Sequence, residues 1–119
     1  MRVLLDTHIA LWALAESSKL SEELVPLLES RDNLVCYSIV SVWEVAIKHA
    51  IHPESMPMPE EDFVKLCEQT GFVRLPLEPA HIYAVKTLSR ERNAARHNDP
   101  FDRLLIAQAK VEGLTFATH

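Results

Sequence analysis

The chain has 119 residues, of which 48% are hydrophobic and 24% charged; this composition predicts a soluble globular domain with its own core and excludes a disordered chain. The net charge of −5 excludes a global positive field that would attract nucleic acid, so any polyanion must be held by local arginines or through a metal. Cys36 and Cys67 form no paired motif, and the unbroken apolar run 9–15 is too short for export or a membrane span. We therefore expect a cytoplasmic protein.

Short apolar or β-branched runs predict strands, and each is followed by a helical pattern. In chain order, we expect a strand at 3–5, helices at 9–15 and 21–30, a strand at 34–39, helices at 41–51 and 60–69, a strand at 72–75, helices at 79–90 and 100–112, and a strand at 114–118. Pro26 predicts either a kink in the second helix or a later start. Ser41 and Glu44 have capping-box spacing, and Gly71 and Gly113 are expected to end helices.

Strands that alternate with helices and are apolar on both faces indicate a parallel sheet covered by helices. The sequence contains no internal repeat, low-complexity tract or linker that would divide it. The predicted fold class is therefore α/β with a mostly parallel central sheet, in one domain that spans residues 1–119.

Four acidic side chains fall where strands end or helices begin. Asp6 follows the first strand, Glu44 lies in the first turn of the helix after the second, and Asp99 and Asp102 open the helix before the last strand. Ligands of open parallel sheets bind at the carboxyl ends of the strands. We therefore expect these chain-distant acids to gather at one edge of the sheet, where their mutual repulsion has to be relieved by protonation or by a cation.

An all-oxygen cluster of this kind suits Mg²⁺ or Mn²⁺. Such a metal lowers the pKa of a bound water and neutralises charge on a phosphodiester during attack. The six histidines show no zinc spacing and are expected to be surface or packing residues, and Trp12, Trp43 and Tyr37 are expected in the core. The pattern therefore points to metal-dependent hydrolysis of phosphodiesters.

Each acid also has a purely structural interpretation. Asp6 could close a strand as an Asx turn, and Asp99 could be a helix N-cap. Glu44 could complete the Ser41 capping box or pair with Lys48 four residues later. Asp102 heads an apolar helix stripe and could be a capping acid. It is the coincidence of all four acids that favours a metal site.

Four segments of the sequence resemble the PIN domain, and more narrowly the VapC-type toxins of toxin–antitoxin pairs. They are 4-LLDTH-8, 41-SVWEVAIK-48, 97-HNDPFDRLLIAQA-109 and 113-GLTFAT-118. The resemblance covers essentially the whole chain. It implies a three-layer α/β/α sandwich, a Mg²⁺-dependent ribonuclease, a cognate antitoxin and a homodimer.

Carried over by residue, the resemblance makes Asp6, Glu44 and Asp102 the metal-binding acids and Asp99 an accessory acid. Basic side chains that could hold the RNA backbone are Arg90, Arg92, Arg96 and Arg103. The family usually has another acid directly after the last strand, whereas this chain stops at His119. We therefore expect either a trimmed chain or a site that lacks one acid.

Three other functions stay open at this point. One is a housekeeping RNA-processing nuclease without an antitoxin. Another is a catalytically impaired interaction module, which the missing acid would favour. Phosphatases and phospho-acceptor domains of the α/β type are less favoured, because 6-DTH-8 lacks the Asp-x-Asp pair that such phosphatases use.

Overall fold

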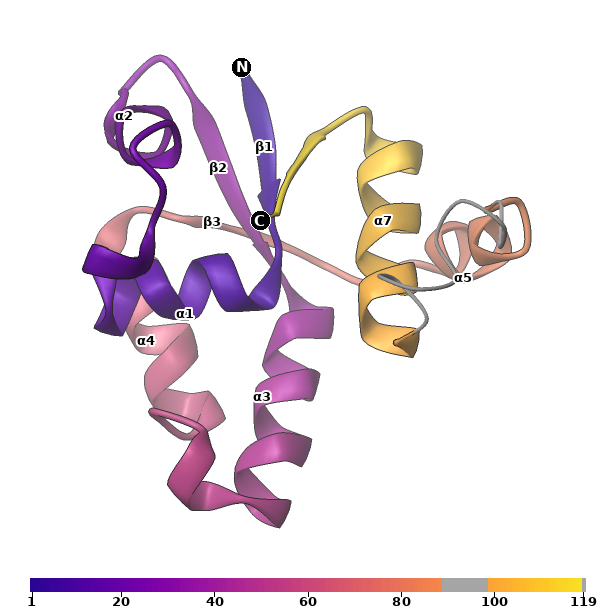
Figure 1. Ribbon diagram of the computed structural model, residues 1–119. Coiled ribbons are helices and arrows are strands. Elements are labelled where there is room, and N and C mark those ends of the chain that lie inside the picture. Colours follow the sequence, from indigo (N-terminus) through magenta and orange to yellow (C-terminus); the bar gives the residue numbers. More distant parts are fainter. Residues whose placement is uncertain (89–98, 119) are drawn as a thin grey trace.

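The computed structural model describes residues 1–88 and 99–118 and shows an all-parallel sheet of four strands (Figure 1). In chain order the strands are β1 (Arg2–Leu5), β2 (Leu34–Ser38), β3 (Val73–Leu75) and β4 (Thr115–Ala117). Their order across the sheet is β3-β2-β1-β4. The predicted α/β class is confirmed, and the sheet is wholly parallel within these strands.

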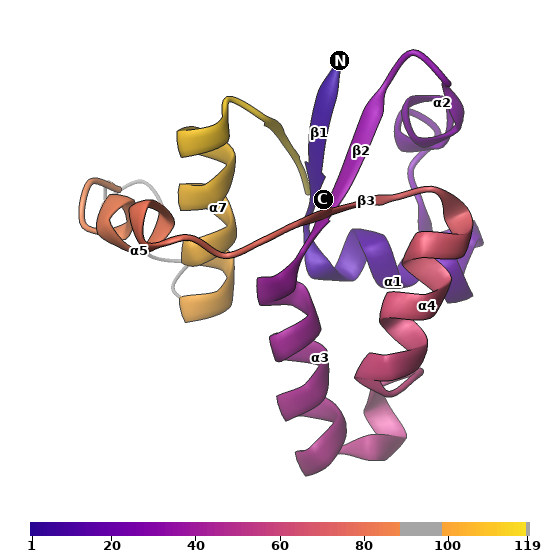
Figure 2. The same ribbon diagram turned by 180° about the vertical axis from the view of Figure 1, so that it is seen from behind.

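Helices follow or precede each strand. They are α1 (Thr7–Ala15), α2 (Leu24–Glu29), α3 (Ile39–Ile51), α4 (Glu60–Thr70), α5 (Pro79–Val85) and α7 (Pro100–Glu112), with short 3₁₀ turns at Ser17–Lys19 and Pro53–Ser55. Helices α1, α2 and α4 lie on one side of the strands, and α5 and α7 on the other (Figures 1 and 2). The arrangement is the three-layer sandwich expected from the sequence.

The two faces of the sheet feed two separate apolar cores, because successive side chains of a strand point in opposite directions. Val3 and Leu5 pack with Phe63 and other residues of α1 and α4. Leu4, between them in the sequence, packs with Leu105 and Ala109 of α7. This explains why the strands read as unbroken apolar runs rather than as alternating ones.

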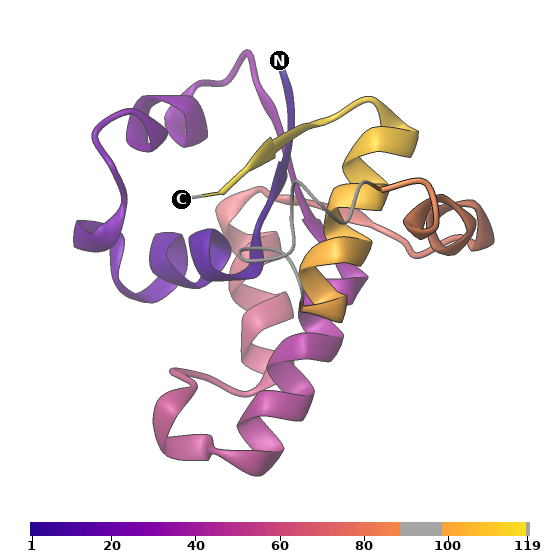
Figure 3. The same cartoon turned by 45° about the vertical axis from the view of Figure 1, so that its right-hand side comes forward.

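Helix α3 extends from the carboxyl end of the sheet and contributes to both cores. Val45 packs in the core on the α1 side, and Val40 in the core on the α7 side. The start of α3 therefore lies between α1 and α7, where β1 and β2 both end (Figures 1 and 3).

The predicted start of α3 was wrong. Ser38, not Ser41, is the N-cap, and its hydroxyl accepts a hydrogen bond from the Val40 amide at 2.9 Å. The capping-box spacing at Ser41 was misleading because Ser38 ends the preceding strand and caps the helix without a linker. Glu44 consequently lies in the second turn of α3 rather than the first.

Other boundaries differ less from the prediction. Helix α2 begins at Leu24, so Pro26 falls in its first turn, where a missing amide proton costs little. Helix α5 was expected to reach about residue 90, but it ends at Val85. Gly71 and Gly113 end α4 and α7 in left-handed conformations, as predicted.

Candidate active site

Asp6 follows β1 directly and is buried, with 5% of its surface exposed. Its Oδ2 accepts a hydrogen bond of 2.7 Å from the Thr118 hydroxyl, which follows β4. Its Oδ1 is also buried but has no hydrogen-bond partner among the described residues. The side chain does not cap α1, so an Asx-type structural role does not account for it.

Glu44 shows the same division between its two oxygens. It is 2% exposed, and its Oε2 accepts a hydrogen bond of 2.5 Å from the Lys48 ammonium group, one turn further along α3. Its Oε1 is buried and has no partner in the described part of the chain. A buried carboxylate oxygen without a partner is costly, because it has lost water and gained nothing in return.

A third pair of side chains links the elements that carry these two acids. Thr7 and Ser41 are buried and share a hydrogen bond of 2.7 Å between their hydroxyl groups. Thr7 is the neighbour of Asp6, and Ser41 lies one turn before Glu44 on the same face of α3. The contact therefore holds the starts of α1 and α3 together and brings Asp6 and Glu44 to the same edge of the sheet.

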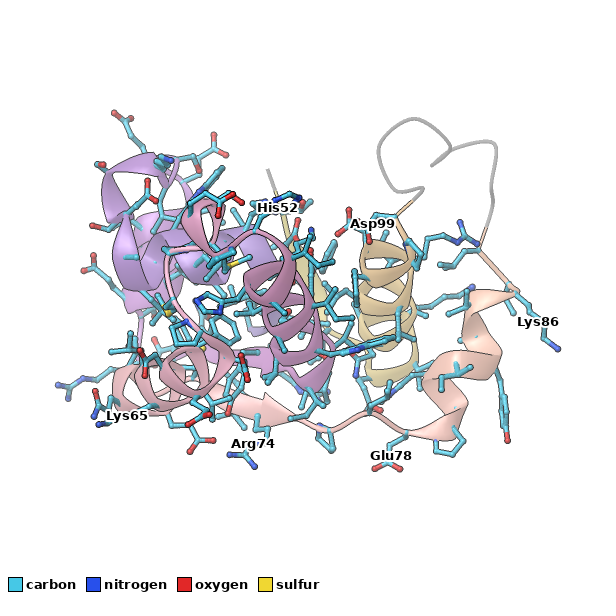
Figure 4. The ribbon with its side chains drawn as sticks, turned by 90° about the horizontal axis from the view of Figure 1, so that it is seen from below. His52, Lys65, Arg74, Glu78, Lys86 and Asp99 are labelled. Atoms are coloured by element: carbon cyan, nitrogen blue, oxygen red, sulfur yellow. The ribbon has the colours of Figure 1, made fainter. Side chains whose placement is uncertain are left out.

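Asp99 and Asp102 come to this region on α7. The Asp99 carboxylate accepts a 2.7 Å hydrogen bond from the Phe101 amide and so caps the helix, as predicted. Asp102 lies half-buried in the first turn. Figure 4 shows Asp99 at the end of α7 that lies beside α3.

The pKa of Lys48 reflects the acids that lie near its ammonium group. Burial alone would lower its pKa, but the hydrogen bond and charge of Glu44 raise it, and so do the charges of Asp99 and Asp102. The pKa of Lys48 consequently stands above its ordinary value. Three acids from α3 and α7 thus act on one ammonium group.

The acids do not form a complete metal cage. Within residues 1–88 and 99–118, no three His, Cys, Asp or Glu side chains are close enough to hold an ion by themselves. The two partnerless oxygens, Asp6 Oδ1 and Glu44 Oε1, nevertheless fit Mg²⁺ or Mn²⁺, because Mg²⁺ binds through one or two carboxylates and keeps several waters. The donor set fits the predicted ion, with water as the remaining ligands.

Comparison with known proteins identifies the family. The model of the PIN domain matches residues 3–119. This chain belongs to the PIN domain family. Members of the family are generally nucleases. No curated protein sequence matched the chain.

One solved structure similar to this PIN domain is described as VapBC2 from Rickettsia felis bound to a DNA fragment from their promoter. Its TM-score is 0.68 at 16% sequence identity, and the match covers 99% of this chain and 87% of that one. At this identity the likeness concerns the fold. It shows that the α/β/α arrangement described above recurs in that toxin–antitoxin protein.

Of the four arginines predicted to hold RNA, the structure of this PIN domain describes only Arg103. The Arg103 guanidinium donates to the Val85 carbonyl at 3.3 Å, so it is held toward α5. Arg90, Arg92 and Arg96 lie outside the described residues. Among the described residues, Lys48 is a cation that lies at the acids. It was considered from sequence only as a helix-pair partner, and its spacing of four residues from Glu44 was the available signal.

A second set of buried polar groups lies on the α5 side of α7. The Ser38 hydroxyl donates to Gln108 Oε1, and Gln108 Nε2 donates to the Pro76 carbonyl at 3.3 Å. His81 accepts from the Glu78 amide through Nδ1 at 2.9 Å and donates through Nε2 to Glu112 at 2.7 Å. Sequence patterns did not indicate this network, which joins β2, α5 and α7.

The remaining candidates offer no chemistry at the acids. Burial raises the pKa of Cys67 to about 12 and raises that of Cys36, so neither thiol is a nucleophile at neutral pH. Trp43 was expected in the core but is 53% exposed and meets Phe101 edge-to-face, with ring centroids 4.9 Å apart. Tyr37 is buried, as expected.

In the described part of the chain, no helix has both the length and the apolar character needed to cross a membrane.

Proposed function

We propose that this PIN domain is a Mg²⁺- or Mn²⁺-dependent endoribonuclease and the VapC-type toxin of a toxin–antitoxin pair. The observation that carries the proposal is the pair of buried, partnerless carboxylate oxygens, Asp6 Oδ1 and Glu44 Oε1, at the carboxyl edge of a parallel sheet. Evolution rarely keeps such atoms without a partner. A divalent cation supplies one.

The residues have separate roles in this proposal. Asp6 and Glu44 would hold the metal directly, while Asp102 would bind it or orient one of its waters, and Asp99 would assist from the cap of α7. When bound, the metal supplies an activated water and neutralises charge on the phosphodiester. Thr118 and Lys48 hold the second oxygens of Asp6 and Glu44 and so fix the direction of the free ones.

RNA binding has to overcome a net charge of −5. We assign backbone contacts to Arg90, Arg92, Arg96 and Arg103, with Arg103 released from the Val85 carbonyl when RNA binds. These contacts would position the strand without reading its sequence. Binding should therefore weaken steeply as salt concentration rises.

The toxin assignment rests on the resemblance of the sequence motifs and on the fold likeness to VapBC2. It implies a cognate antitoxin as protein partner, a homodimer of one domain per chain and a cytoplasmic location. Co-expression with the product of a neighbouring small gene tests the antitoxin. A stable complex that suppresses cleavage is the expected result, and cleavage unaffected by that product would favour a housekeeping nuclease.

Cleavage of a fluorescent single-stranded RNA tests the activity. We expect cleavage with Mg²⁺ or Mn²⁺, loss of cleavage in EDTA, and poor replacement by Zn²⁺, which prefers nitrogen and sulfur ligands. Glu44→Gln should also abolish cleavage, since it keeps the shape of the side chain and removes the charge that would hold the metal. Cleavage that survives EDTA, or that Glu44→Gln leaves intact, would contradict the proposal.

A non-catalytic interaction module is the second candidate. The observation that favours it is that no three potential ligands in the described residues gather into a metal site. Metal binding without cleavage of any RNA, in a chain that still binds an antitoxin, would favour this candidate.

A further inference from the structure

Lys48 lies beside a carboxylate that the proposed function assigns to the metal ion, at the oxygen that does not face the ion. Its ammonium group is 2.5 Å from Glu44 Oε2, and the charges of Asp99 and Asp102 also act on it. Its side chain is 40% exposed, whereas that of Glu44 is 3% exposed. The cation therefore closes the solvent side of a buried carboxylate.

Glu44 divides its two oxygens between different partners. Oε2 is taken by Lys48, and Oε1 is left without one. A magnesium ion binds a carboxylate oxygen at about 2.0–2.1 Å. An ion at Oε2 would therefore collide with the ammonium group that already occupies this oxygen. Lys48 and Glu44 are four residues apart on one helix, which keeps the ammonium group beside Oε2 when an ion binds at Oε1.

The local charge sets how many divalent ions can be held. Asp6, Glu44, Asp99 and Asp102 provide four carboxylates, and Lys48 compensates one of them. A first divalent ion would neutralise most of the remainder. A second one, about 4 Å away as in two-metal nucleases, would be repelled by both the first ion and Lys48.

Resting on the proposed function, we infer that Lys48 is a positioning residue that takes the place of a second metal ion. It holds Glu44 Oε2 so that Oε1 faces the bound ion, and it restricts the site to one divalent cation. The proposed nuclease is thus a one-metal enzyme with a built-in ammonium group. This assigns to Lys48 a function beyond that of a helix salt bridge.

Titration of metal-free protein with Mn²⁺ tests the inference, with calorimetry giving the number of ions and electron paramagnetic resonance giving the free Mn²⁺. The wild-type chain should bind one ion. Lys48→Met should bind two, because the compensating charge and the obstruction at Oε2 are both gone. Lys48→Gln, which can still donate a hydrogen bond, should also bind two if charge is the cause, and Lys48→Arg should bind one.

Lys65→Met is the matched control. Lys65 is exposed on α4, and Figure 4 shows it on the opposite side of the molecule from Asp99, so its variant should bind one ion. A salt bridge with only a structural role would lower the stability of Lys48→Met without changing the number of ions.

The outcomes separate the inference from the proposed function. Two ions in the wild-type chain, or one ion in both Lys48→Met and Lys48→Gln, would overturn the role of Lys48 while Mn²⁺-dependent cleavage stood. No Mn²⁺ binding by any variant, together with no cleavage, would overturn both. Circular dichroism of each variant shows whether it is folded, and Lys48→Gln decides the question if Lys48→Met is not.

Discussion

The two sets of buried polar groups on either side of α7 differ in one respect. On the α5 side, the polar atoms of Ser38 and Gln108 and both ring nitrogens of His81 have partners. On the other side, Asp6 and Glu44 each keep one buried oxygen without any described partner. Asp99 and Glu78, one from each region, lie at opposite ends of α7 (Figure 4).

Under the proposed function, the first region serves packing and the second binds the metal ion. A network whose polar atoms all have partners fixes the relative positions of β2, α5 and α7 and needs no water or ion to complete it. Two partnerless carboxylate oxygens raise the free energy of the metal-free fold, and a bound cation would lower it. Substitutions in the first region should therefore change stability, and substitutions in the second should change metal binding and cleavage.

The largest expected effect comes from Asp6→Asn. The amide oxygen can still accept from Thr118, so the fold should be kept, and without metal the variant should be at least as stable as the wild type because a buried charge is removed. RNA cleavage should fall by roughly 100-fold or more, since Asp6 is a proposed direct ligand and loss of even an orienting partner costs about 10–100-fold. Single-turnover cleavage and thermal melts with and without Mg²⁺ measure both effects.

Asp6→Asn should also abolish stabilisation by Mg²⁺. At a concentration 100 times the dissociation constant, an ion that binds only the folded chain stabilises it by about 2.7 kcal/mol. A variant that still gains this stabilisation and still cleaves RNA would show that Asp6 is not a metal ligand.

The opposite pattern is expected from Gln108→Leu, which keeps the side-chain volume but removes the amide. Ser38 would lose its acceptor and the Pro76 carbonyl its donor, at a cost of about 2–3 kcal/mol in the free energy of unfolding. Urea denaturation measures the change. Gln69→Leu, at an exposed position of α4, is the control and should shift stability by less than about 0.5 kcal/mol.

Mn²⁺ affinity should separate this variant further from Asp6→Asn. Gln108→Leu should bind Mn²⁺ with nearly unchanged affinity under conditions where it is folded. A large loss of metal affinity would show that the two sides of α7 are coupled and that the distinction drawn between them is too sharp.

How much of this could be predicted depended on whether a residue's role is local. The strands, the cap at Asp99 and the end of α7 at Gly113 follow from short patterns, and each was predicted. The start of α3 was not, because Ser38 and Ser41 both suit an N-cap and only the length of the preceding strand decides between them.

The side-chain networks could not be predicted, because they depend on contacts between distant segments. Gln108 appears in the sequence as a polar residue on an amphipathic helix and gives no sign that Ser38 lies beside it, 70 residues away. The four acids were identified as candidates from their positions at strand ends and helix starts. Which oxygen of Asp6 and Glu44 is free depends on Thr118 and Lys48, and this required the structure.

A smaller effect should follow from Thr118→Val, which acts on Asp6 from outside the metal site. The variant removes the hydroxyl that holds Oδ2, so the carboxylate becomes free to rotate. Loss of such an orienting partner lowers metal affinity or activity by about 10-fold. Thr115→Val, on the exposed side of β4, is the control, and equal Mn²⁺ affinity in the two variants would remove Thr118 from the site.

The smallest expected effect concerns Asp99, whose carboxylate is engaged with the Phe101 amide at 2.7 Å. If the cap is its main role, Asp99→Ala should lower the free energy of unfolding by about 1 kcal/mol, whereas Asp99→Asn should lower it by only a few tenths, because asparagine caps as well as aspartate. Cleavage should fall only a few-fold in Asp99→Asn, since the carboxylate is engaged with the Phe101 amide and is proposed only as an accessory acid. Asp102→Asn should behave in the reverse manner, keeping stability while losing most of its cleavage and its stabilisation by Mg²⁺. Melts and cleavage assays on the three variants decide between the two acids. An inactive Asp99→Asn beside an active Asp102→Asn would exchange their roles and make the residue that begins α7, rather than the one in its first turn, the acid that this helix contributes to the metal.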